Sequence, residues 1–226
     1  MNDSVDGSSP ARGALPETFV RDPIVEDGTY WGMLSQKPHR RPPPFSELKA
    51  EYKSRWTEMK IRTNRLDTVK GQARQISSNR DRYEVVSAVT AVPWYVIGVI
   101  HSKESGLSFS GHLHNGDPLI ARTVLVPAGR PTTGHPPFTW EESAIDALNF
   151  DGLAANNDWS IEKTGYLLEK FNGFGYRRQT PPVPTPYLWA FSDQYVKGYY
   201  VSDGRYDPDA VARNCGAMPL LKMLLE

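Results

Sequence analysis

The chain has 226 residues, a length that suits one globular domain with an appendage, and 39% of them are hydrophobic, enough for a sizeable core. Basic and acidic residues are equal in number, 26 of each, so net charge points to no partner and gives no reason to expect nucleic-acid binding. The single cysteine, Cys215, excludes an internal disulfide, and the absence of an apolar run of about 18 residues predicts no membrane-spanning segment.

Residues 1–44 are rich in Pro, Gly, Ser and Asp, and predict an irregular segment without the apolar core of a signal peptide. We therefore expect synthesis in the cytoplasm and a separate delivery route to any target outside it. Residues 45–80 show helical spacing of apolar side chains and predict a basic helical extension. Between residues 37 and 82 there are thirteen basic and five acidic side chains, which leaves open an anionic polymer as partner. A solvated helix face explains the same charges, and no nucleic-acid motif accompanies them.

Two further helices are predicted over residues 81–92 and 93–105, the second with a proline at its start and a glycine just past its end. Ile97, Ile100 and Glu104 are spaced to share one face of that second helix. Glu104 should therefore emerge in the last turn, at the rim of a core. Burial and the negative end of the helix dipole both disfavour a charged carboxylate, so we expect a raised pKa. Such an acid can protonate the leaving oxygen in glycoside cleavage, although a last-turn Glu can also simply face water.

The hydrophobic period then changes. Residues 107–114 alternate, and Asn115-Gly116 is typical of a tight turn, so we predict a β-hairpin within 107–126, followed by a Pro-rich loop. Helices are predicted from a capping box at Thr139, from Ser160, and from Asp207 to the end. The fold class expected is therefore mainly α, with one small hairpin.

Several polar side chains of the predicted hairpin are candidate site residues. Asp117, just past the turn, is a candidate second carboxylate that would activate water, or else a turn residue that accepts backbone N–H bonds. His112 and His114 would share one side of a strand and bind sugar hydroxyls. His112, His114 and Asp117 could form a metal site together with His101 or His135. Their spacing in the chain does not match that of known metal-ligand motifs, so we do not favour such a site, and we expect no cofactor.

The order of these motifs resembles the lysozyme-like superfamily, which includes soluble lytic transglycosylases and goose-type lysozymes. In those enzymes a helix ends with a catalytic Glu followed by Ser, here Glu104-Ser105, and a later helix closes on an aromatic-Asn-x-Gly segment, here within Phe171–Tyr176. The resemblance covers about residues 80–226, which we take as the catalytic domain, here 81–226. The chain departs from the transglycosylase pattern because His112–Leu119 replaces a Gly-Leu-Met-Gln type segment.

This resemblance implies cleavage of β-1,4 bonds in peptidoglycan glycan strands by a muramidase or lytic transglycosylase, acting as a monomer. Glu104 would be the general acid, with Ser105, Asn172 and Tyr176 lining the sugar groove. In a transglycosylase the substrate's own hydroxyl attacks, so Glu104 alone would serve as acid and then base. The alternatives are a chitinase-like glycosidase and a non-catalytic glycan-binding or assembly protein on the same fold. For Asn172 and Tyr176, a helix cap and core packing are the competing structural roles.

Overall fold

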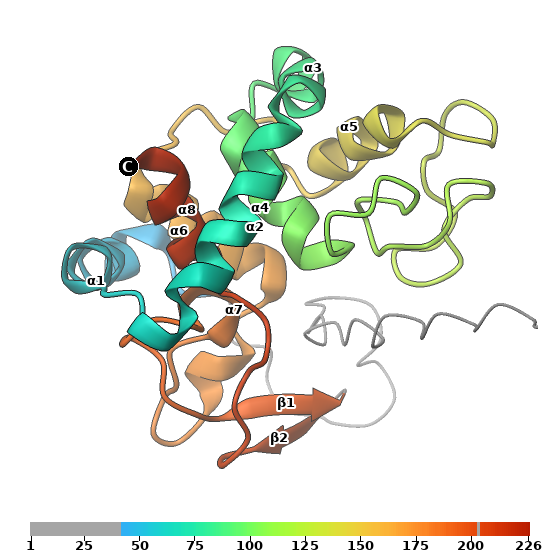
Figure 1. The fold of residues 1–226 in the computed structure, drawn as a ribbon. Coiled ribbons are helices and arrows are strands. Elements are labelled where there is room, and N and C mark those ends of the chain that lie inside the picture. The colour runs from blue at the N-terminus through green and yellow to red at the C-terminus, as the bar shows by residue number, and fades with distance from the viewer. Residues whose placement is uncertain (1–41, 203) are drawn as a thin grey trace, which may run out of the picture.

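The computed structural model describes residues 42–202 and 204–226, and every structural statement below refers to them (Figure 1). They form a mainly helical fold with one two-stranded antiparallel sheet, so the predicted fold class is confirmed. The elements are α1 (Phe45–Glu58), the 3-10 turn η1 (Thr63–Arg65), α2 (Leu66–Ser78), α3 (Arg80–Thr90), α4 (Trp94–Glu104), α5 (Trp140–Phe150), α6 (Ile161–Asn172), the 3-10 turn η2 (Gly175–Arg178), α7 (Pro186–Trp189), β1 (Tyr199–Ser202), β2 (Arg205–Asp207) and α8 (Ala217–Leu225).

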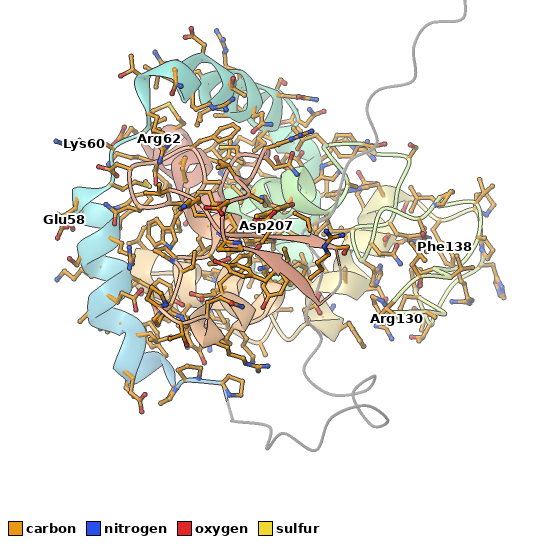
Figure 2. All side chains as sticks on the ribbon, turned by 90° about the horizontal axis from the view of Figure 1, so that it is seen from below. Glu58, Lys60, Arg62, Arg130, Phe138 and Asp207 are labelled. Carbon is orange, nitrogen blue, oxygen red and sulfur yellow. The ribbon has the colours of Figure 1, made fainter. Side chains whose placement is uncertain are left out.

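The helical pattern after Phe45 is divided between α1 and α2. The chain leaves the helix after Glu58 because it pairs there with a distant segment: Ile61 forms an antiparallel bridge with Ser192, and the Arg62 backbone N–H donates to the Phe191 carbonyl at 2.9 Å. Figure 2 shows Lys60 and Arg62 on this connection, directly after Glu58. The tertiary pairing therefore overrides a local pattern that would otherwise continue as helix.

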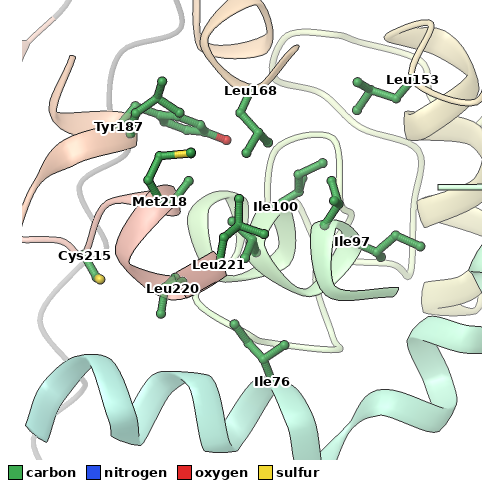
Figure 3. Close-up of a cluster of buried hydrophobic side chains, with 14 of the residues drawn as sticks. Ile76, Ile97, Ile100, Leu153, Leu168, Tyr187, Cys215, Met218, Leu220 and Leu221 are labelled. Carbon is green, nitrogen blue, oxygen red and sulfur yellow. The ribbon is translucent and has the colours of Figure 1, made fainter. Parts of the chain in front are cut away.

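Helix α4 is the centre of the core. All of its residues from Val96 to Glu104 are buried, and it packs against α2, α3 and α8. Figure 3 shows Ile97 and Ile100 of this helix among side chains from α2, α6, α7 and α8. The core face expected for these two isoleucines is confirmed, but the helix is enclosed on its other faces as well. Residues 96–100 are an uninterrupted apolar stretch, so this part of the helix has no polar face. A helix of this kind is buried on all sides.

Residues 45–80, the predicted basic helical extension, contribute buried side chains to this same core. Helix α1 packs against α6, and its fully buried Tyr52 donates a hydrogen bond to Oε2 of Glu169 at 2.6 Å. Arg177 of η2 holds the same carboxylate in a two-point contact, with nitrogen–oxygen distances of 2.8 and 2.9 Å. A buried carboxylate needs such partners, because an unpaired charge in a core is strongly destabilising. The predicted boundary after residue 80 lies within the first turn of α3 (Arg80–Thr90).

The hairpin predicted within 107–126 is wrong in its location. That region holds a single antiparallel bridge, between Gly111 and Pro118, around the Asn115-Gly116 turn. A strand cannot return along 121–126, because the Asp117 side chain binds the backbone N–H groups of Val124 and Leu125 that a ladder would need. A short two-stranded sheet occurs instead at β1 and β2, where Tyr200 pairs with Tyr206.

The last helix begins later than predicted. Asp207 ends β2, and its Oδ1 accepts the backbone N–H bonds of Asp209 and Ala210, which forms a turn rather than a helix start. Helix α8 begins only at Ala217. Cys215 lies just before it, buried, and burial raises the pKa of its thiol to about 12. A buried thiol with a raised pKa carries little thiolate and is therefore unreactive.

Candidate active site

Glu104 is the last residue of α4, and its side chain is only 4% exposed. Its backbone is covered by the turn that follows, since a side chain placed on Gly116 would lie 3.3 Å from the Glu104 carbonyl oxygen. Gly116 also has a φ of 77°, so both its conformation and its surroundings require glycine. The backbone at the end of this core helix is therefore covered by a turn that a larger residue at position 116 would push away.

Tyr187 is the group that orients this carboxylate. Its hydroxyl donates to Glu104 Oε1 at 3.2 Å, and its ring is 2% exposed. It is presented by the short helix α7, which a proline begins at its first position. This helix is not predictable from the sequence, because four residues are too few to show a hydrophobic period.

Lys103 lies beside the same tyrosine. Its ammonium nitrogen is 4.9 Å from the centre of the Tyr187 ring and donates to the Cys215 carbonyl at 2.9 Å, and the side chain is 6% exposed. A carboxylate, a phenol and an ammonium thus gather at the end of α4. In a largely water-free site, such groups interact more strongly than they would in solvent.

Asp117 makes the contacts of the turn residue that was the alternative to its catalytic role. Its Oδ2 accepts hydrogen bonds from the backbone N–H groups of Val124 and Leu125, at 2.8 and 2.9 Å, and from the Asn115 side-chain amide at 3.1 Å. The residue is 8% exposed. These contacts are those expected of a turn residue that accepts backbone N–H bonds. The carboxylate of Asp117 fixes the path of the loop after residue 118.

His112 and His114 are buried within the structure rather than directed to a sugar. His112 contacts the Ser143 hydroxyl through Nδ1 at 2.8 Å and the Ala121 carbonyl through Nε2 at 2.8 Å. His114 contacts Asp146 through Nε2 at 2.8 Å, and burial lowers its pKa to about 4. Both rings tie the 112–118 turn to α5, and their assignment as substrate-binding residues stays a prediction.

The other three predicted site residues lie at the ends of α4 and α6 and within η2. Ser105 caps α4, and its N–H and hydroxyl both bond to the His101 carbonyl. Asn172 is the last residue of α6 and is buried. The helix cap, which was the alternative role for Asn172, is Gly173, with a φ of 88°. The Tyr176 hydroxyl accepts the backbone N–H of Tyr200 at 3.3 Å, and the two rings pack edge to face, so this tyrosine anchors the small sheet.

The remaining histidine of α4 is also used internally. The His101 ring contacts the Tyr83 hydroxyl and the Ser108 carbonyl, and burial lowers its pKa to about 4. Because a carbonyl can only accept, Nε2 carries the proton and Nδ1 accepts from Tyr83. Among residues 42–202 and 204–226, no three His, Cys, Asp or Glu side chains are arranged to hold a metal ion.

One cavity, of about 180 Å³, lies away from this region. Lys70, Ala73, Arg74 and Ser77 of α2 line it together with Met223 of α8. None of the predicted site residues contributes to it. In the described part of the chain, no helix taken singly is long and apolar enough to cross a membrane. Comparisons of the chain with known protein families, with curated proteins and with solved structures found no match.

Proposed function

We propose that this protein cleaves β-1,4 glycosidic bonds of peptidoglycan, with Glu104 as the general acid. The observation that carries the proposal is the buried carboxylate of Glu104, held by the Tyr187 hydroxyl at the end of the enclosed helix α4. Glycoside cleavage needs an acid that protonates the leaving oxygen, in a site from which water is largely excluded. The choice of peptidoglycan as substrate comes from the resemblance of Glu104-Ser105 and Phe171–Tyr176 to lysozyme-like enzymes.

The neighbours of Glu104 suit the charge changes of such a reaction. When Glu104 gives up its proton it becomes a carboxylate, and a hydrogen bond donated by Tyr187 stabilises that charged form. The Lys103 ammonium, close to the Tyr187 ring, adds positive charge in the same region. Both groups are already in place before the reaction, so little reorganisation accompanies the proton transfer.

The contacts of Asp117 favour a mechanism with one carboxylate. An inverting hydrolase needs a second carboxylate to activate water, and a retaining one needs it as a nucleophile. Asp117 Oδ2 is already engaged by three donors that hold a loop. Glu104 would therefore act first as acid and then as base, while a hydroxyl of the glycan itself attacks the anomeric carbon. This is the transglycosylase outcome, which releases anhydro-muramoyl ends instead of reducing ends.

The test is the digestion of purified peptidoglycan, with mass spectrometry of the released fragments. Glu104→Gln keeps the shape of the side chain but has no proton to give, so cleavage should fall by about a hundredfold or more. Tyr187→Phe should reduce cleavage by roughly tenfold, because it removes one hydrogen bond to the acid. Tyr52→Phe is the matched control, since it removes a hydroxyl that binds a different buried carboxylate, Glu169.

The products decide among the alternatives. Anhydro ends support transglycosylation, and reducing ends indicate hydrolysis with a nucleophile other than Asp117. Cleavage of chitin but not of peptidoglycan would identify the protein as the chitinase-like glycosidase. Near-normal turnover by Glu104→Gln would refute the role of this residue. A folded wild type that binds glycan strands without cutting them would identify the non-catalytic alternative.

A further inference from the structure

The segment from residue 120 to 126 carries the densest group of exposed aliphatic side chains in the described part of the chain. Ile120 is 76% exposed, Val124 78%, Leu125 58% and Val126 45%. The other exposed large hydrophobic residues are spread singly or in pairs over several elements. Single exposed apolar residues are ordinary, whereas a contiguous apolar patch marks an interaction surface.

The backbone of this segment is fixed, so the exposure is part of the fold. Asp117 binds the N–H groups of Val124 and Leu125, and the Asn115 side chain donates to the Leu125 carbonyl at 3.0 Å. Thr123, within the segment, is buried. Its hydroxyl donates to the Pro127 carbonyl and its backbone N–H donates to the Arg130 carbonyl. The inward polar contacts leave the aliphatic side chains directed outward.

The segment belongs to a lobe that extends beyond α5, away from the rest of the molecule (Figure 1). Figure 2 shows Arg130 and Phe138 in this lobe. Residues 118–139 contain Arg122 and Arg130 and no Asp or Glu. Arg130 is paired with Asp146 of α5 and lies over the half-exposed ring of Phe150. The lobe therefore presents apolar groups without a carboxylate of its own to repel an anionic surface.

We propose that residues 120–126 dock the protein on the surface of a lipid bilayer, with the four aliphatic side chains inserted at the headgroup boundary. The composition favours lipid over a protein partner, because protein interfaces gain most of their affinity from Trp, Tyr and Arg, and Leu and Val are under-represented at their hot spots. Insertion of aliphatic side chains needs no matching pocket. Arg122 is half-buried at the base of the segment, where its guanidinium donates to the Gly134 carbonyl and lies over the Phe138 ring, and its positive charge adds attraction to anionic headgroups.

Vesicle co-sedimentation with the full chain tests this surface. The vesicles contain phosphatidylcholine alone, or phosphatidylcholine with phosphatidylglycerol. The wild type should bind both, and more strongly when anionic lipid is present. Val124→Ser/Leu125→Ser should bind at least about tenfold more weakly. Val89→Ser/Val196→Ser is the matched control and should bind as the wild type does, because those valines are 64% and 67% exposed outside the segment.

A second measurement does not depend on the serine variant being folded. Val124→Cys takes an environment-sensitive thiol dye, and Cys215 should remain unlabelled because it is buried with a raised pKa. Vesicles should shift the emission of this dye to the blue, and should leave a dye at Val89→Cys unchanged.

Three results would overturn the proposal. One is a wild type that does not sediment with either vesicle. Another is an equal loss of binding in both serine variants. The third is a lipid-free dimer, seen by analytical ultracentrifugation, that Val124→Ser/Leu125→Ser dissociates, since a second copy of the chain would then be the occupant. None of these measurements involves glycan cleavage, so they are independent of the role of Glu104.

Discussion

Asp117 offers the sharpest test of how this site is built, through the pair of variants Asp117→Ala and Asp117→Asn. The carboxylate accepts two backbone N–H bonds and one side-chain bond at a single oxygen. Hydrogen bonds to a charged group each contribute roughly 1.5–3 kcal/mol when they are shielded from water. Because Val124 and Leu125 are exposed, water can replace part of this loss, and we expect Asp117→Ala to cost about 3 kcal/mol in total.

Asp117→Asn should behave differently. An amide oxygen can occupy the Oδ2 position and accept the same three bonds, so the loop should keep its path and the cost should be about 1 kcal/mol. If Asp117 has no part in the chemistry, peptidoglycan cleavage by the folded Asn variant should stay within a few-fold of the wild type. A hydrolase that used this carboxylate to activate water would instead lose about a hundredfold or more.

The assay combines urea unfolding, which measures the free energy of unfolding, and thermal unfolding, which measures the Tm, with digestion of cell walls under conditions where each variant is folded. A Tm decrease of roughly 6–12 °C corresponds to the expected cost of Asp117→Ala in a protein of this size. An Asn variant that is as stable as the wild type but inactive would refute the assignment of Asp117 to the loop. An Ala variant with unchanged stability would show that the three hydrogen bonds contribute little.

Two further predictions concern the stability of the fold. Burial lowers the pKa of His101 and His114 to about 4, so the unfolded chain binds more protons than the folded one below about pH 6.5. The free energy of unfolding should therefore be highest above that pH and fall towards pH 4 by about 6 kcal/mol, about 3 kcal/mol from each histidine. Urea titrations that gave equal values at neutral and acid pH would contradict this. Gly216→Ala should destabilise the protein by at least about 2 kcal/mol, because the new methyl group would lie 2.4 Å from the Leu188 carbonyl oxygen. Gly71→Ala, on an open face of α2, should instead stabilise it by up to about 1 kcal/mol, and equal thermal shifts in the two variants would contradict the packing argument.

The sequence predicted those elements whose signals are local. The capping box of α5 is present, with the Thr139 hydroxyl accepting the Glu142 N–H and the Glu142 carboxylate accepting the Thr139 N–H. Helices α3, α4 and α6 also begin and end close to their predicted limits. In each case a proline, glycine or polar cap marks the boundary within the chain itself.

The predictions that failed depend on distant contacts. Asn115-Gly116 does form a turn, but the strand expected after it is absent, because the Asp117 side chain takes the N–H groups that a ladder would use. In the same way Glu104 was identified from its own helix, whereas its partner Tyr187 is 83 residues away in the chain. A local pattern contains no record of such contacts, so the second half of the site was not predictable.

The turn at residues 112–118 connects the two proposals and yields a final prediction. It covers the Glu104 carbonyl through Gly116, and through Asp117 it holds the exposed aliphatic segment. Loss of the aliphatic side chains, in Val124→Ser/Leu125→Ser, removes no group that contacts Glu104, so cleavage of soluble glycan fragments should be unchanged while vesicle binding falls. Release of the turn, in Asp117→Ala, should impair both activities, because the same hydrogen bonds position the loop and the cover over α4. If Asp117→Ala reduced vesicle binding and left cleavage intact, the turn would have no role in positioning Glu104.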